Sequence, residues 1–547
     1  MIARVLRVLL GVALVGYLFD LGGSSIWDAN EAFYAETPRE MIESGDYVNP
    51  SFNYEPRFNK PVLSYWIVAG LYHLFGVSVA VQRLAITAGA LIMVLAAYLL
   101  ARAASAQALA PLVAALGLAA NPRFFMFARR IMIDVSLAAL MTLVLLCFAL
   151  SERYPHRRRG LLVAMYVFVG LGVLTKGPVA AVLPALVFAA YLAFYGELGR
   201  IRAMMIPTGA AIVLAVVAPW YLALYRESGW THITEFFIGE NLDRFTSLVG
   251  PQSRGPFFYV PVLITDSLPW SLALPAAVAV WIGERRTRQA GPESRVRTLL
   301  LLWIVVIVGF FSISQTKQDL YIFPIVAAVA ALGGDFMARG MAAAGGLERR
   351  LTGTTLAAGG VVLVCLGLAA IYLFGRSGIV YALDGARIAG TVAVAGGAAT
   401  IWLARRQPTA AVAALLAVLV AVNWTLVLRV LPGFERYKPV VPLSAAVLAH
   451  ARAGDIVVHY DVALPSMVFY LQRHIDMTYA PEAFLEKMRS GSGVLAVLAE
   501  DRYEALRREL PPTCVVGRQE TFDAKLKELI VPRTPPAILL ISTRCPP

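Results

Sequence analysis

Basic residues stand at the ends of several apolar segments, where they could bind a phosphate group. Together with two nearby acids they are Lys60, Arg129, Arg130, Asp134, Lys176, Lys317 and Asp319. Lysine and arginine are the usual protein ligands of phosphate, and positioned cations stabilise the negative charge that develops on a leaving phosphate. Charges at the ends of membrane helices can also act as interfacial anchors. We predict phosphate binding for the set, with anchoring as the alternative for each single residue.

Acidic residues fill the segment that follows the first apolar run. Asp28 and Glu31 lie three residues apart, so both would share a face if the segment is helical. A carboxylate there could take a proton from an incoming acceptor or orient it. We therefore predict that Asp28 or Glu31 is catalytic. The charged residues that follow are expected to form an exposed helix with internal ion pairs; they are Glu36, Arg39, Glu40 and Glu43.

Membrane-spanning helices are the elements that must position these residues. The chain has 547 residues, of which 59% are hydrophobic and 15% are charged. Apolar runs of about 20 residues recur, and each can cross a hydrocarbon core of about 30 Å as a helix, which gives about 13 spans. They lie near residues 4–23, 79–103, 107–120, 131–150, 161–175, 178–196, 203–225, 258–282, 298–314, 319–338, 353–375, 386–404 and 409–430. The shorter run 61–76 is predicted to be a helix that dips into the membrane interface, with a further span as the alternative.

Charge differences between alternate loops predict the orientation in the membrane. The first run resembles an uncleaved signal anchor. Loops 151–160 and 284–298 are rich in arginine, whereas loop 24–78 is rich in acids. Because cytoplasmic loops carry the excess of Lys and Arg, the N-terminus is predicted to lie inside, and loops 24–78 and 226–257 outside. The basic residues on the outer face break this bias, which favours a lipid phosphate as their partner.

The pattern changes beyond residue 431 to short alternating elements. Buried strands are predicted at 455–460 and 494–500, and amphipathic helices at 442–452, 463–472 and 501–509. Alternating strands and helices of this length predict a small extracytoplasmic α/β domain at 432–547. The transmembrane catalytic domain then comprises residues 1–431.

Composition also bears on partners and cofactors. The net charge is +13, but the arginines lie in short loops and no basic stripe interleaved with aromatics occurs, so nucleic-acid binding is not expected. The four cysteines show no metal-ligand spacing. No cofactor is predicted, and a divalent metal is left open. Cys514 and Cys545 could form a disulfide if the tail is extracytoplasmic.

Seven segments carry a resemblance to a known group of enzymes. They are WDANEAFYAETPREM, EPRFNKPVLSYW, RRIMID, LTKGP, ENLDRF, SLPW and TKQDLYIFP, in this order between residues 27 and 324. With them the chain resembles the GT-C glycosyltransferases that use polyprenyl-phosphate sugars. These include the bacterial aminoarabinose transferases acting on lipid A and the protein O-mannosyltransferase-like enzymes. The C-terminal region is similar in placement to the periplasmic domain of those transferases.

The resemblance implies a GT-C fold and a reaction on the periplasmic face of the bacterial inner membrane. A sugar would pass from undecaprenyl phosphate to a lipid, glycan or protein acceptor, without a nucleotide and with inversion. The donor lipid, the acceptor and membrane lipids are the implied partners, and the chain is expected to act as a monomer. The residues assigned to substrate binding are Tyr34, Lys60, Arg129, Arg130, Lys176, Arg244, Lys317, Asp319 and Tyr321.

Two other functions are weighed against the enzyme. A transporter or lipid flippase is the alternative, and a structural or regulatory membrane protein is the third hypothesis. The candidate charges lie at one face rather than at the membrane midplane, and no repeated halves with broken helices are visible. These features favour the enzyme.

The first outer loop departs from the pattern of the group. Asn30 stands where the group has the Asp of an Asp-Glu pair, which is taken as the catalytic carboxylate. Asn cannot act as a base, so that role shifts to Asp28 or Glu31. Glu31 matches the second residue of the pair and can have a structural duty, which favours Asp28. Asp134 is expected to be the second essential acid.

Two further departures concern a metal. In the aminoarabinose transferases a Glu and a His, linked to a bound zinc, stand where this chain has Asn59 and Asn241. Amides are poor zinc ligands. We therefore expect a relative with a different donor or acceptor and without that zinc.

Overall fold

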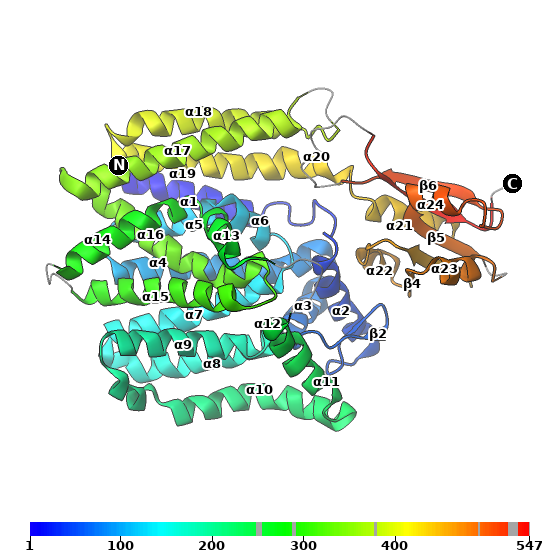
Figure 1. The fold of residues 1–547 in the computed structure, drawn as a ribbon, viewed down its shortest axis with the longest axis horizontal. Helices are drawn as coiled ribbons and strands as arrows, with labels where there is room; N and C mark the ends of the chain where they lie inside the picture. Colours follow the sequence, from blue (N-terminus) through cyan, green and yellow to red (C-terminus); the bar gives the residue numbers. More distant parts are fainter. Residues whose placement is uncertain (248–253, 287–290, 377–379, 491–492, 523–533, 546–547) are drawn as a thin grey trace.

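The computed structural model describes residues 1–247, 254–286, 291–376, 380–490, 493–522 and 534–545. A bundle of long helices makes up most of the molecule, and a smaller region of strands and short helices adjoins one end of it (Figure 1). Helices α2 (Asn30–Ser44) and α3 (Leu63–Phe75) lie at that same end of the bundle (Figure 1). The first long loop, residues 24–78, is therefore placed between the bundle and the strand region.

Nine helical segments of the described residues are long and apolar enough to cross a membrane. Their α-helical parts are α4 (Val79–Ala104), α7 (Ile133–Arg153), α8 (Arg158–Lys176), α10 (Ile206–Ser228), α15 (Pro292–Ile313), α16 (Val326–Ala342), α17 (Gly346–Phe374), α18 (Ala386–Ala404) and α19 (Pro408–Thr425). The short helical turns between them are η1 (Pro155–Arg157), η2 (Leu198–Met204), η6 (Asp319–Ile325) and η7 (Leu426–Val430). The predicted fold class, an α-helical multi-pass membrane protein, is confirmed.

Two bent helix pairs raise the number of spans to as many as eleven within the described ranges. The first pair, α5 (Ala110–Ala120) and α6 (Pro122–Ala128), is bent by 66°. The second pair is bent by 112°. Its first arm consists of η4 (Pro256–Phe258) and α13 (Tyr259–Asp266), and its second arm of η5 (Trp270–Ala273) and α14 (Leu274–Arg286). Pro122 and Pro269 lie at the two breaks, where the missing backbone N–H interrupts helical hydrogen bonding.

The remaining two predicted spans form shorter helices. They are α1 (Ile2–Leu18), of 17 residues, and α9 (Val179–Phe194), of 16 residues. Both lie within the bundle, where α1 packs against α5 and α19, and α9 packs against α15 (Figure 1). Every predicted span thus corresponds to a helix, although these two are shorter than the length expected of a membrane-crossing helix.

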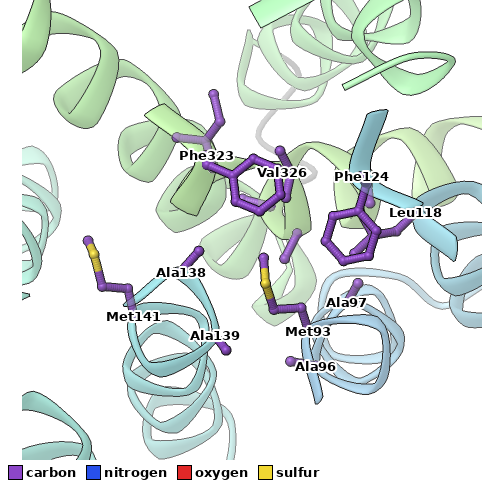
Figure 2. Close-up of a cluster of buried hydrophobic side chains, with 14 of the residues drawn as sticks. Met93, Ala96, Ala97, Leu118, Phe124, Ala138, Ala139, Met141, Phe323 and Val326 are labelled. Atoms are coloured by element: carbon purple, nitrogen blue, oxygen red, sulfur yellow. The ribbon is translucent and has the colours of Figure 1, made fainter. Parts of the chain in front are cut away.

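A buried cluster at the centre of the bundle anchors η6, the turn before α16. The ring of Phe323 stacks on that of Phe124, with 5.8 Å between centroids. Figure 2 shows these rings, with Val326, over Ala138 of α7 and Met93 of α4. Close packing of this kind holds side chains in single rotamers. The chain just before Phe323 is therefore held firmly against the bundle.

Helix α2 corrects one expectation about the first loop. Glu36, Arg39 and Glu40 are buried, with 0%, 7% and 2% of their surface exposed, although an exposed helix was predicted. The predicted ion pairs do form, with Arg39 bound to Glu36 at 2.6 Å and to Glu43 at 2.7 Å. The strands β1 (Ser51–Phe52) and β2 (Glu55–Pro56) fold back on α2, and α3 packs on its other side. Tertiary packing therefore covers a polar helix face.

The second long loop is also helical where it is described. It contains α11 (Thr231–Thr234), η3 (Glu235–Asp243) and α12 (Arg244–Thr246). The turn η3 is a π-helix, a form that often occurs at functional sites. These elements approach the first loop at the same end of the bundle as α3 (Figure 1).

The C-terminal region is built on a five-stranded sheet with the order β4-β3-β5-β7-β6. Its elements are α20 (Leu431–Glu435), α21 (Val440–His450), β3 (Ile456–Tyr460), α22 (Ser466–Leu471), β4 (Asp476–Thr478), α23 (Pro481–Met488), β5 (Val494–Ala499), α24 (Glu500–Leu506), β6 (Cys514–Glu520) and β7 (Ala537–Ser542). Strand β3 is parallel to β4 and β5, while β7 is antiparallel to β5 and β6. The predicted strands and helices correspond to β3, β5, α21, α22 and α24.

Apolar side chains cover both faces of this sheet. Val457 and Leu495 pack in one cluster with residues of α21 and α22. Val458 and Ala496, one position on, pack in another cluster with residues of α23 and α24. Successive side chains of a strand point to opposite faces, so a strand covered on both sides is apolar throughout. This explains the continuous apolar runs seen in the sequence.

Cys514 and Cys545 lie close to each other at the end of the sheet. Cys514 pairs across the sheet with Ser542 of β7, and Cys545 follows three residues later. Burial and the neighbouring Cys545 thiol raise the pKa of Cys514 to about 11. Both thiols are free in the structure, so a disulfide between them stays a prediction.

Candidate active site

A cavity of about 780 Å³ opens where the two long loops meet the bundle. The first loop, the start of α7, the turn between α8 and α9, η3 and η6 all contribute to its wall. Its charged residues are Arg57, Lys60, Asp134, Lys176, Glu240, Arg254 and Asp319. One side is apolar and is formed by α7, α9 and α15, with residues such as Leu137, Val182 and Phe311.

Two ion pairs stand in the cavity wall. Lys176, in the last turn of α8, binds Asp134, in the first turn of α7. Lys60 binds Glu240 of η3 at 2.6 Å. A cation at a helix C-terminus and an acid at an N-terminus are both favoured by the helix dipole. The structure thus brings together three predicted site residues, Lys60, Asp134 and Lys176, and adds Glu240.

The turn η6 contributes Asp319 and Tyr321, both predicted. The ring centroid of Tyr321 lies 5.2 Å from the ammonium of Lys176. Arg123 binds Asp319 at 2.7 Å and also binds the buried Asp266. Tyr34, predicted as well, lines the cavity from α2. Arg123 was not predicted, although it lies shortly before the segment RRIMID, which was the available signal.

Arg57 and Arg254 are two cavity residues that sequence reasoning missed. The guanidinium of Arg57 lies 3.9 Å from the ring centroid of Phe33, and among the described residues no carboxylate lies within 4.0 Å of it. Arg254 donates a hydrogen bond to the backbone oxygen of Lys317 at 3.1 Å. Arg57 stands three residues before Lys60 in the segment EPRFNKPVLSYW, and that spacing was the available signal.

Glu31 is not among the residues that line the cavity, and its catalytic role stays a prediction. Its side chain is 2% exposed and binds the buried Arg83 at 2.7 Å. It also accepts hydrogen bonds from the backbone N–H groups of Trp27 at 2.7 Å and Ile131 at 3.2 Å. The start of α2 turns this side chain inward, so Glu31 ties the first loop to the bundle.

The structure also places Asp28 outside the residues that line the cavity. Its carboxylate accepts two hydrogen bonds of 2.7 Å, from the backbone N–H and the hydroxyl of Ser466. Partial withdrawal of this carboxylate from water raises the pKa of Asp28 to about 6, while the bonds from Ser466 act in the opposite direction. Asn30, two residues later, does line the cavity. The role of Asp28 as the catalytic acid in place of Asn30 stays a prediction, since Asn30 lines the cavity and Asp28 does not.

The structure also separates three predicted cations from the cavity. Arg129 donates to the backbone oxygens of Gly16 and Asp20 near the end of α1. The guanidinium of Arg130 lies 3.7 Å from the ring centroid of Trp27. Lys317 donates to the backbone oxygen of Ser314. The side chain of Arg244, a further predicted residue, lies outside the described part of the chain.

The residues present do not fit the zinc site that the resemblance implies. Asn59 and Asn241 both line the cavity, and the Asn241 amide donates to the backbone oxygen of Phe236 at 2.8 Å. Amide groups are weak zinc ligands. No group of three or more His, Cys, Asp and Glu side chains suited to a metal occurs in the described ranges. No step proposed below passes through a metal.

Changing Glu31 to Gln is expected to cost stability rather than catalysis. Removing the charge partner of a buried cation costs about 3–5 kcal/mol, so Glu31→Gln should lower the thermal midpoint and the amount of folded protein. The transfer rate per folded molecule should stay near that of the parent protein. Thermal unfolding in detergent, followed by size-exclusion chromatography, measures the first effect. Glu482→Gln is the control, because Glu482 is an exposed acid in the first turn of α23. A stable Glu31→Gln protein that transfers no sugar would restore the catalytic role.

Comparisons with known proteins agree with this architecture. Residues 59–222 match the family model described as dolichyl-phosphate-mannose-protein mannosyltransferase. An undecaprenyl phosphate-α-4-amino-4-deoxy-L-arabinose arabinosyl transferase of Pseudomonas fluorescens (strain Pf0-1) is 31% identical over 377 residues, which are 64% of this chain and 61% of that protein. The corresponding transferase of Pseudomonas aeruginosa (strain UCBPP-PA14) is 32% identical over 378 residues, 65% of this chain and 62% of its own. The matched region thus spans about three fifths of these relatives.

A solved structure extends the likeness to the whole fold. The crystal structure of ArnT from Cupriavidus metallidurans bound to undecaprenyl phosphate superposes with a TM-score of 0.80 and 24% identity. The superposition covers 98% of this chain and 97% of that one, so it includes the C-terminal sheet region. The fold that the resemblance implies is therefore confirmed, and this chain has the GT-C fold.

Proposed function

We propose that this protein transfers a sugar from undecaprenyl phosphate to an acceptor at the outer face of a bacterial inner membrane. The observation that carries the proposal is the cavity, in which four cations stand beside an apolar wall. A lipid-linked sugar phosphate needs both surfaces, since its phosphate is anionic and its chain is apolar. The names of the similar transferases, which specify an undecaprenyl phosphate donor, support the same carrier.

The cations would bind the phosphate that leaves during transfer. Breaking the bond between the anomeric carbon and the phosphate oxygen leaves a phosphate monoester, and its added negative charge is stabilised by cations placed beforehand. Lys60, Lys176 and Arg57 stand in the cavity for this role. Before the donor binds, Lys60 and Lys176 are held by Glu240 and Asp134. The polyprenyl chain would follow the apolar wall of α7, α9 and α15.

A carboxylate in the cavity would act on the acceptor. Asp134 is the best candidate, because Lys176 and the start of α7 hold its carboxylate in place. It would orient the acceptor or take its proton as the acceptor attacks the anomeric carbon. Attack on the face opposite the phosphate inverts that carbon. Asn30 and Tyr34 line the same cavity and would contact the sugar.

Direct transfer and lipid analysis test the proposal together. Purified protein, mixed with undecaprenyl-phosphate sugars and membrane extract, should release undecaprenyl phosphate and yield a glycosylated acceptor. Mass spectrometry of lipids and glycans from a deletion strain should show one species that lacks a single sugar, which identifies the donor and the acceptor. A transporter or flippase would instead move the donor lipid across vesicles without forming a glycosylated product. That result would overturn the proposal.

The proposal includes a division of the chain and an orientation. The transmembrane catalytic domain comprises residues 1–431, and the α/β domain comprises residues 432–547 on the periplasmic side; the protein acts as a monomer. The proposal is supported by the arginine-rich loops and by two elements that line the cavity. These elements, α2 and η3, belong to the two long loops, which lie at the end of the bundle that adjoins the sheet (Figure 1). All of the substrate sites then lie outside the cytoplasm.

Cysteine labelling checks this orientation. In a chain without its native cysteines, Glu504→Cys should react with a membrane-impermeant maleimide in spheroplasts, because α24 is expected outside. Arg157→Cys should react only after the membrane is permeabilised, since positive loops stay in the cytoplasm. Both positions are exposed in the structure. The opposite labelling pattern would place the cavity on the cytoplasmic side and contradict the assignment.

A further inference from the structure

The C-terminal region holds the first outer loop at two separate places. At the first place Asn53, which is 6% exposed, exchanges two hydrogen bonds with the backbone of Ile475, at 2.9 Å and 2.8 Å. Phe52, next to it, packs inside the core of the sheet region with Val468 and Leu471. Buried, reciprocal hydrogen bonds resist displacement because breaking them leaves polar groups unpaired. This end of the loop is therefore well fixed.

The second place of contact is at Asp28 and the start of α22. Both carboxylate oxygens of Asp28 accept hydrogen bonds from Ser466, at 2.7 Å each. The backbone N–H of Ile26 also donates to the hydroxyl of Tyr470, at 3.0 Å, in the same helix. Hydrogen bonds to an ionised acceptor are about twice as strong as neutral ones. Helix α22 therefore holds the chain just before α2. The two helices contact each other and lie side by side in Figure 1.

Cavity residues lie directly beside both attachments. Asn30 follows Asp28 by two residues, and Arg57 and Lys60 follow Asn53 by four and seven. Two residues of extended chain span at most about 7 Å, so a displacement of Asp28 also changes the position of Asn30. Asn30, Arg57 and Lys60 all line the cavity. The loop thus carries its substrate contacts next to points that the C-terminal region holds.

We propose that Asp28 and Ser466 form a latch through which the C-terminal region positions Asn30 in the substrate cavity. Asp28 is then a positioning residue and not the base that takes the acceptor proton. This inference rests on the proposed function, because sugar transfer is one of its readouts. It also gives the C-terminal region a role in catalysis, although none of its described residues lines the cavity.

The isosteric amide separates a latch from a base. In Asp28→Asn the amide oxygen can still accept from the Ser466 N–H, and the amide nitrogen can donate to the Ser466 hydroxyl, which is also an acceptor. The latch geometry is thereby kept, whereas an amide cannot act as a base. Asp28→Ala removes both hydrogen bonds. A latch therefore predicts that the Asn variant is active and the Ala variant is impaired.

Transfer kinetics of the full-length protein test the latch. Asp28→Asn should keep at least half of the parent kcat/KM, and Asp28→Ala should lose about 10-fold, because misplaced contacts reduce effective molarity. Ser466→Thr should be close to the parent, and Ser466→Ala should be impaired. The double variant Asp28→Ala/Ser466→Ala should be no worse than Asp28→Ala alone, since the two residues act through one contact. An Asn variant as inactive as the Ala variant would show a base and overturn the latch, as would a fully active Ala variant.

Hydrogen–deuterium exchange supplies a readout that does not need activity. Asp28→Ala should exchange faster than the parent in the segment 24–36, and Asp28→Asn should match the parent. Asp501→Ala, at an exposed site on α24, is the control and should leave that segment unchanged. If the parent transfers no sugar but the exchange pattern is as expected, the proposed function fails and the latch stands. If transfer occurs but Asp28→Ala leaves exchange unchanged, the latch fails alone.

Discussion

Replacing Lys60 or Lys176 by alanine is expected to lower the proposed sugar transfer by about 100-fold, because a positioned charge on a leaving group is worth about 2.7–4 kcal/mol. Both ammonium groups line the cavity, and each is held by a carboxylate, Glu240 or Asp134. The loss should appear in kcat as well as in kcat/KM, since the added charge exists only in the transition state. Arginine at either position should restore part of the rate.

Single-turnover transfer from a purified donor lipid measures this effect at equal amounts of folded protein. Arg226→Ala is the matched control, because Arg226 is an exposed cation at the end of α10. Arg130 and Lys317 were predicted to bind phosphate as well. Their alanine variants should lose much less transfer activity, since these side chains contact Trp27 and the Ser314 backbone. Parent rates for both the Lys60→Ala and Lys176→Ala proteins would place the phosphate site elsewhere.

Asp134→Asn is expected to lower transfer by about 100-fold or more, as general acid–base groups typically contribute 100-fold to 10,000-fold. The amide keeps the shape of the side chain and can still accept a hydrogen bond from Lys176. The loss therefore reports the missing negative charge rather than a cavity or a lost contact. Binding of the donor lipid should change little, because the phosphate cations remain in place.

The other cavity acids provide the comparison that makes this assignment specific. Glu240→Gln and Asp319→Asn should each lose less than Asp134→Asn, since these acids hold Lys60 and Arg123 respectively. Initial rates at saturating donor, over a range of acceptor concentrations, distinguish the three variants. An active Asp134→Asn protein together with an inactive Glu240→Gln protein would move the acceptor acid to η3.

Local sequence patterns determined the positions of the apolar helices and of the strands β3 and β5, but not those of β4, β6 and β7. Runs of apolar residues gave the spans because each helix satisfies its own backbone hydrogen bonds in lipid. Strands β3 and β5 were found because both of their faces are buried. Lys60, Asp134 and Lys176 were found for a related reason: a charge at the end of an apolar run must lie at the membrane surface. These are properties of short segments, so they need no knowledge of neighbours.

Tertiary structure alone decided which charged side chains from distant segments meet. Asp28 and Glu31 lie three residues apart in the same acidic segment. Ser466, 438 residues from Asp28, binds Asp28, whereas Arg83 binds Glu31. Glu36 and Glu40 look like exposed acids, but β1 and α3 bury them. Lys60 meets Glu240 across 180 residues. Side-chain pairs of this kind depend on how the loops fold over the bundle. No periodicity or spacing in the sequence indicates that two such distant residues lie close in space.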